Sequence, residues 1–144
     1  KKVILKKPTR KGYAFKGWYT NSNYTKKITS IKKGSKKNYT VYAKWSKIKV
    51  KKTTGLKVTN TNGRNLVVKY SKVSGAKGYQ ITYATNSKFT KGKKVVNTTK
   101  RTKTIKKLKK GKTYYVRVRA YKKDSTGRKV YGKYSKVKKV KITK

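Results

Sequence analysis

The ten residues from Thr113 to Lys122, TYYVRVRAYK, alternate between two kinds of side chain. One set is apolar and consists of Tyr114, Val116, Val118 and Ala120. The other set carries the cations and consists of Tyr115, Arg117, Arg119 and Tyr121. Successive side chains of a β-strand point to opposite faces, so this period of two predicts a strand with one buried and one outer face.

Most other apolar segments of the chain have the same period, and no segment shows a helical stripe. Between Leu56 and Ile142 we expect six further strands, at 56–61, 65–73, 78–85, 94–100, 102–108 and 129–142. Their predicted core side chains include Tyr70, Tyr79 and Leu108. Seven short strands with turn residues at intervals of about 8–12 residues favour an all-β sandwich.

The composition excludes most catalytic chemistry. The 144 residues contain one acid, Asp124, and no histidine or cysteine. General acid–base catalysis, zinc sites and calcium sites draw on these missing groups. We therefore predict a protein that is not an enzyme and that needs no cofactor or metal, with Asp124 as a turn residue that binds its own backbone.

The cations set the strongest constraint on function. Lysine and arginine number 47, which gives a formal net charge of +46. Neighbouring charges must lie closer than the Debye length of roughly 8 Å, so they repel and destabilise the fold. Two explanations stay open, namely selection for an anionic partner and a compositional bias of the source organism. The candidate polyanion-binding residues are Lys106, Lys107, Lys109, Lys110, Arg117, Arg119, Lys122 and Lys123.

The outer face of the 113–122 strand allows two interpretations. Its two tyrosines and two arginines could form a stacking platform for nucleic acid or sugar. They could also form an ordinary solvated face of a sandwich strand, which is the more common case. Tyr131 and Tyr134, near the last strand, are either exposed contact residues or part of the packing on the sheet.

One motif carries a resemblance to a known family. The pattern L-x-x-G-x-x-Y-x-V-x-V-x-A is formed by Leu108, Gly111, Tyr114, Val116, Val118 and Ala120. Residues 54–142 thereby resemble a fibronectin type III domain, a seven-stranded immunoglobulin-like sandwich. The resemblance implies that Tyr114 is the tyrosine-corner residue and that Tyr70 replaces the family's usual tryptophan. Thr54 and Lys110 stand where the family often has proline.

The first part of the chain has a second resemblance. PTRKGYAFKGWYTN, from Pro8 to Asn21, and the later TVYAKW are similar to the internalin B-repeat, or Listeria–Bacteroides repeat, of bacterial surface proteins. The resemblance implies a small β-grasp-like module. Its usual opening strand and turn are absent, so we expect a truncated module in which residues 2–5 form the first strand. Trp18 and Trp45 either fill its small core or bind glycans. The expected organisation is a module at 1–47, a basic linker at 48–55 and the fibronectin type III domain at 56–144.

These observations leave three functional hypotheses. The first is a non-catalytic adhesion module, secreted or at the surface of a Gram-positive bacterium, that binds teichoic acid, mucin or glycosaminoglycan. The second is a released messenger acting on a host receptor, as the fibronectin type III hormone irisin does. The third is a structural spacer of a larger surface protein. Binding to nucleic acid in vitro is expected from charge and would be non-specific.

Two further expectations concern the whole chain. No run of about 18 apolar residues occurs, so we predict no membrane-spanning segment. The sequence begins at Lys1 and not at methionine, which predicts a fragment or a product cut from a longer precursor.

Overall fold

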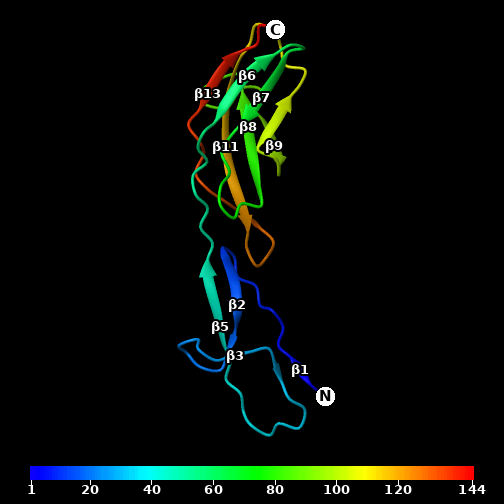
Figure 1. Ribbon diagram of the computed structural model, residues 1–144, viewed down its shortest axis with the longest axis vertical. Coiled ribbons are helices and arrows are strands. Elements are labelled where there is room, and N and C mark those ends of the chain that lie inside the picture. The colour runs from blue at the N-terminus through cyan, green and yellow to red at the C-terminus, as the bar shows by residue number, and fades with distance from the viewer. The chain divides into compact units, whose positions relative to one another are not determined.

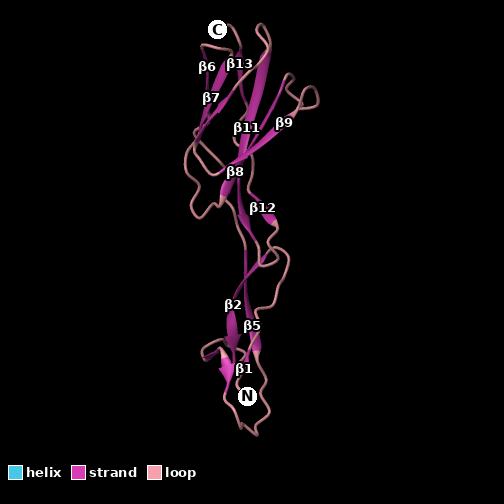
Figure 2. Ribbon diagram, turned by 90° about the vertical axis from the view of Figure 1, so that its right-hand side faces the viewer, coloured by secondary structure: helices cyan, strands magenta, loops and turns pink.

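The computed structural model describes residues 1–144 and consists of strands, turns and loops without a helix (Figure 2). The chain forms two compact units. Unit 1 contains Lys1–Ile48 and the turn Lys123–Lys129, and unit 2 contains Lys49–Lys122 and Val130–Lys144. The all-β prediction is confirmed, because the alternating segments form strands (Figure 1).

One layer of unit 2 is a three-stranded antiparallel sheet in the order β10-β7-β6. Its strands are β6 (Lys57–Thr61), β7 (Asn65–Lys69) and β10 (Thr102–Ile105). A tight turn joins β6 to β7, and its positive backbone angles fall on Gly63 and Arg64. The central strand β7 turns Leu66 and Val68 into the interior, where both side chains are fully buried.

The second layer is a sheet in the order β12-β11-β8-β9, with β13 also paired to β11. Its strands are β8 (Gly78–Ala84), β9 (Lys94–Thr98), β11 (Thr113–Lys123), β12 (Lys129–Tyr131) and β13 (Lys138–Lys141). The long strand β11 is central and antiparallel to β8, with Val118 opposite Ile81.

The last predicted strand, 129–142, is wrong as one continuous element, because it divides into β12 and β13. Gly132 N–H still donates to the Ala120 carbonyl, and Ser135 N–H to the Val118 carbonyl. The Ser135 hydroxyl, however, accepts the Val118 N–H at 3.0 Å, which replaces a ladder bond. The two strands are therefore the halves of one interrupted strand of the sandwich.

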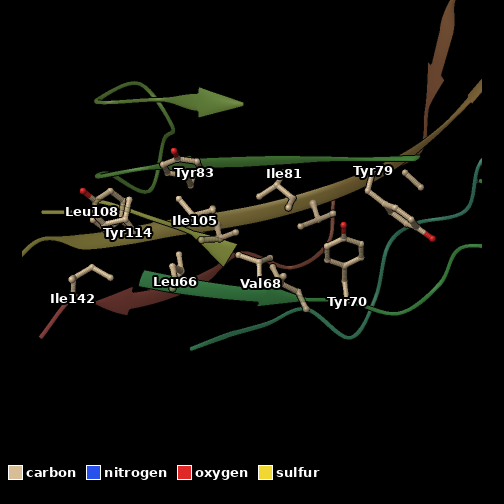
Figure 3. Packing of buried hydrophobic residues seen from close by; sticks show 14 of the residues in the cluster. Leu66, Val68, Tyr70, Tyr79, Ile81, Tyr83, Ile105, Leu108, Tyr114 and Ile142 are labelled. Carbon is tan, nitrogen blue, oxygen red and sulfur yellow. The ribbon is translucent and has the colours of Figure 1, made fainter. Parts of the chain in front are cut away.

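Side chains from the two sheets meet in one core (Figure 3). Figure 3 shows Leu66, Val68 and Tyr70 of the first layer facing side chains of the second layer, among them Ile81 and Tyr114. The four core residues singled out in the sequence, Tyr70, Tyr79, Leu108 and Tyr114, are all buried, with 4–6% of their surface exposed. The alternation in β11 is confirmed as well, since Val116, Val118 and Ala120 are fully buried.

Unit 1 is built from two small sheets, β3-β2-β5 and β1-β4. Its strands are β1 (Val3–Ile4), β2 (Tyr13–Tyr19), β3 (Lys27–Ile28), β4 (Ser30–Ile31) and β5 (Tyr42–Lys47). Residues 2–5 thus contain a first strand, as expected. Gly17 interrupts the register between β2 and β5, and no apolar side chain of unit 1 is fully buried.

The predicted linker forms no strand, but its residues from Lys49 onward cluster with unit 2. Val50 packs against the core, Thr53 is fully buried, and Thr53 N–H donates to the Lys133 carbonyl. This segment is therefore held along the sandwich by its own contacts.

Candidate functional site

Three loops come together at the end of unit 2 that holds the C-terminus (Figure 1). The turn between β6 and β7 binds the chain end, because Arg64 N–H donates to the Lys144 carbonyl at 2.9 Å. The same turn binds the loop before β11, because Leu108 N–H donates to the Arg64 carbonyl at 3.1 Å. Gly111 N–H and the Ile142 carbonyl, 2.7 Å apart, join that loop to the last residues.

These loops carry a group of cations that we call the basic pole. Its members are all exposed and are Arg64, Lys106, Lys107, Lys109, Lys110, Lys112, Lys141 and Lys144. Unit 2 contains no acidic side chain, because Asp124 belongs to unit 1. The pole is therefore a positive surface with no acidic side chain in its unit, which favours attraction of a polyanion.

The tyrosine corner holds one loop of the basic pole in place. The Tyr114 hydroxyl accepts the Lys109 N–H at 3.0 Å. Tyr114 itself is buried beside Tyr83, with ring centroids 6.2 Å apart. A core side chain thus fixes the backbone of a basic loop, so that core packing and the surface charge are physically linked.

Two other core tyrosines also bind backbone. The Tyr79 hydroxyl accepts the Val73 N–H at 2.9 Å. The Tyr70 hydroxyl donates to the Lys100 carbonyl. Burial raises the pKa of Tyr70, and the neighbouring Tyr79 raises it further, so this hydroxyl stays protonated and able to donate.

The structure separates the eight predicted polyanion-binding residues. Lys106, Lys107, Lys109 and Lys110 lie in the basic pole, whereas Lys122 and Lys123 lie at the far end of β11. Ten residue steps of a strand span about 33 Å, so the two groups form separate surfaces. The Lys122 ammonium also donates to the Lys49 carbonyl at 2.9 Å.

The guanidinium groups of Arg117 and Arg119 pack against aromatic rings of their own unit. The Arg117 guanidinium lies 4.2 Å from the Phe89 ring centroid and 4.0 Å from that of Tyr134. The Arg119 guanidinium lies 3.7 Å from the Tyr131 centroid and 4.6 Å from that of Tyr134. We call these five residues the arginine stack. It is completed by a hydrogen bond of 2.8 Å from Arg119 Nε to the amide oxygen of Gln80.

The arginine stack corrects both interpretations of the outer face of β11. Its arginines are partly buried, and its ring faces already hold guanidinium groups. The face is therefore neither a free aromatic platform nor a simple solvated surface. Tyr131 and Tyr134 pack on the sheet, and Tyr131 also meets Tyr121 edge to face at 6.0 Å.

Sequence reasoning missed Arg64, Lys112, Lys141 and Lys144 as members of the basic pole. The signal was present in the strand order. Strands that alternate in direction bring every second connection to the same end of a sandwich. The turn after β6, the loop before β11 and the end of β13 therefore meet, although they are far apart in sequence.

The tryptophans of unit 1 form a partly exposed aromatic cluster around Phe15. Trp18 and Trp45 each lie 5.6 Å from the Phe15 ring centroid in edge-to-face geometry. Trp18 Nε1 donates to the Lys6 carbonyl at 2.9 Å. Each ring thus has a packing role, while part of each stays in contact with solvent.

Asp124 is a turn residue, as expected. One carboxylate oxygen accepts the Thr126 N–H at 2.8 Å and the Arg128 N–H at 3.1 Å, and the other accepts the Gly12 N–H at 2.8 Å. The Gly12 bond, followed by the Thr126 hydroxyl, lowers the pKa of Asp124 to about 2. All its contacts are internal to unit 1.

No group of three or more histidine, cysteine or acidic side chains is present to hold a metal ion. The structure contains no helix that could span a membrane.

Comparisons with known proteins identify both parts of the chain. The sequence profile of the Listeria-Bacteroides repeat domain matches residues 1–44, and that of the fibronectin type III domain matches residues 51–133. Both kinds of domain are typical of extracellular or surface proteins, and fibronectin type III domains are generally non-catalytic. No curated protein sequence matches the chain.

Several solved structures share the fold. The FN1-FN3 domains of chicken CNTN1 align with a TM-score of 0.57 and 18% identity over 74% of this chain and 36% of theirs. An Fn3-like protein from Clostridium thermocellum aligns with a TM-score of 0.51 and 23% identity over 64% of this chain and 92% of that one. A structure described as a myokine aligns with a TM-score of 0.52 and 16% identity, covering 65% of this chain and 98% of its own.

Proposed function

Because the chain belongs to the fibronectin type III family and carries a Listeria-Bacteroides repeat before that domain, we propose that it is an adhesion module of a secreted or surface protein of a Gram-positive bacterium. Its partners are anionic polymers, namely teichoic acid of the wall, mucin or glycosaminoglycan. The contact surface is the basic pole of unit 2.

The observation that carries this proposal is the convergence of eight exposed cations in a unit that has no acidic side chain. The loops that carry them are joined by backbone hydrogen bonds, so the charges are held together before any partner binds. Each polymer charge that is neutralised releases a condensed counterion, which drives binding and weakens it in salt. Lys122, at the other end of β11 in the same unit, adds a second, smaller contact.

The test is a binding measurement on immobilised teichoic acid and heparin, with neutral dextran as a reference, from about 50 to 500 mM salt. If five to eight cations are engaged, the affinity falls with a logarithmic slope of about 4 to 6. Exchange of Lys106, Lys107, Lys109 and Lys110 for glutamine should weaken binding by about tenfold or more at low salt, and should flatten the slope.

A matched variant distinguishes the contribution of the basic pole to binding from that of the total charge. Lys69, Lys72, Lys77 and Lys100 are exposed lysines at the opposite end of the sandwich, and their exchange for glutamine removes the same charge. We expect this variant to lose much less affinity than the pole variant. Equal losses in the two variants would contradict a role of the basic pole, and salt-independent binding would contradict the polymer mechanism altogether.

The remaining hypotheses predict different results in the same assay. A messenger binds a host cell-surface protein saturably and keeps its affinity in salt. A spacer binds neither polymers nor cells more strongly than its charge predicts. Double-stranded DNA belongs in the panel as a non-specific polyanion, because binding to it is expected for any surface of this charge.

A further inference from the structure

Unit 2 has a pocket away from the basic pole. It lies between the segment that leads into β6, residues 52–57, and the interruption between β12 and β13. Its volume is about 510 Å³, which falls within the range of about 300–1,000 Å³ that is typical of small-molecule sites. Residues 132–137 lie here outside the assigned strands, although Gly132 and Ser135 keep backbone bonds to β11.

The lining combines apolar walls with a positive rim. The walls are mostly apolar, and Leu56, whose side chain belongs to the core, forms part of them. Four exposed lysines also line the pocket, namely Lys52, Lys57, Lys136 and Lys138. Lysine stems cover apolar surface while their ammonium groups stay in water. A ligand in this pocket therefore meets hydrocarbon inside and positive charge at the opening.

The wall also contains a polar atom without a partner. Thr53 lines the pocket and is completely buried, and its hydroxyl oxygen has no hydrogen-bond partner. Buried hydroxyls are nearly always hydrogen-bonded in folded proteins, so an unpaired one marks a place where an acceptor or donor is missing. This oxygen has essentially no accessible surface, so the apolar lining and the lysines, and not Thr53, would contact a ligand.

From these observations we infer that the pocket binds a small amphiphile with one anionic head, a carboxylate or a phosphate ester, on an apolar body. The apolar body occupies the lined interior, and the head lies among the four lysines. A polymer of repeated charges does not fit this description, because the pocket offers one positive opening and an apolar interior. The inference is independent of the proposed adhesion function, which uses the basic pole.

The test is an NMR titration of the full chain with four probes: octanoate, octyl phosphate, octanol and inorganic phosphate. We expect octanoate and octyl phosphate to shift the amide signals of residues 53–57 and 135–138. Octanol lacks the head and inorganic phosphate lacks the apolar body, so each should bind about tenfold more weakly. The first two probes also distinguish a carboxylate from a phosphate ligand.

Variants localise the site. Joint exchange of Lys136 and Lys138 for glutamine should weaken octanoate binding about fivefold. Joint exchange of Lys109 and Lys110 for glutamine removes the same charge in the basic pole and should leave octanoate binding unchanged. The inference is overturned if octanol binds as well as octanoate, if the shifts fall outside the pocket, or if the Lys136 and Lys138 variant binds like the pole variant.

Discussion

Arg119 illustrates how this protein holds a partly buried cation without a carboxylate. Its guanidinium lies on the faces of Tyr131 and Tyr134, and its Nε donates to Gln80. The negative face of an aromatic ring attracts a cation, and the interaction strengthens as water is removed. With one acid among 144 residues, tyrosine rings and amide oxygens take the place that carboxylates have in most domains.

We predict that Arg119→Lys lowers the free energy of unfolding by about 1 kcal/mol, although the charge is kept. A lysine ammonium is a point charge that cannot stack on two rings as the planar guanidinium does. Urea unfolding gives the measurement, and Arg101→Lys, at an exposed site, serves as the control with little change. Equal stabilities of the two variants would show that the arginine stack adds nothing.

The pH dependence of stability should follow Asp124. Hydrogen bonds lower its pKa to about 2 in the folded state, from the ordinary value of 3.8. A depressed folded pKa means that folding favours the carboxylate, so its contribution is fully present above about pH 4 and is lost as the pH falls through 2. Thermal unfolding measured from about pH 5 to about pH 2 should show this loss of stability in the native chain but not in Asp124→Asn.

Because Asp124 is the chain's one acidic side chain, its carboxyl signal in a ¹³C NMR titration can be assigned directly. A measured midpoint near the ordinary value would contradict the bonds to Gly12 and Thr126.

At the scale of the element, the break between β12 and β13 is set by packing against a segment distant in sequence. Gly132 lies against the predicted linker, and a Cβ at this position would lie 2.6 Å from the Lys51 carbonyl oxygen and 2.9 Å from a methyl group of Val50. The carbonyl belongs to the backbone and cannot rotate away. Glycine at this position therefore allows the linker segment to pack against the sheet.

At this scale we predict that Gly132→Ala destabilises unit 2 by about 1–3 kcal/mol, the usual cost of overpacking. Differential scanning calorimetry measures the loss as a lower unfolding midpoint. Lys133→Ala, one residue later and exposed, is the comparison and should change little. A Gly132→Ala variant as stable as the native chain would mean that residues 49–51 do not lie where the structure has them.

At the scale of the whole molecule, like charges repel one another across the surface. The 47 cations face one acid, so most of their neighbours carry the same sign. Repulsion between exposed charges is screened by salt, with a Debye length of about 30 Å at 0.01 M and about 3 Å at 1 M. The same charge that attracts a polyanion therefore opposes folding.

We predict that the thermal midpoint rises as sodium chloride increases from about 0.01 to 1 M, because screening relieves repulsion in the folded state. The variant with glutamine at Lys106, Lys107, Lys109 and Lys110 should be more stable than the native chain at low salt and less sensitive to salt. A midpoint that stays constant across the series, or falls, would mean that repulsion is not a significant cost.

Much of the fold was predictable because strand periodicity is local. The buried positions of β7 and most of those of β11 follow from alternation, and the motif from Leu108 to Ala120 identified the family. Strand β8 is buried on both faces, which alternation did not predict. The break at Gly132 was not predictable, because the neighbour that requires it, Lys51, is distant in sequence. Half of the basic pole was predicted from the sequence, since Arg64, Lys141 and Lys144 come from distant parts of the chain, and Lys112 is the one missed member in the same loop as the predicted lysines.

The sequence by itself determined the all-β class, the core face of each strand and the great excess of positive charge, because side-chain alternation and composition do not depend on distant contacts. Only the tertiary structure decided which cations are exposed and free to bind a partner. It placed Arg117 and Arg119 against aromatic rings, gathered lysines of three loops into the basic pole, and opened a lysine-rimmed pocket beside Thr53. These features depend on how strands and loops meet in space.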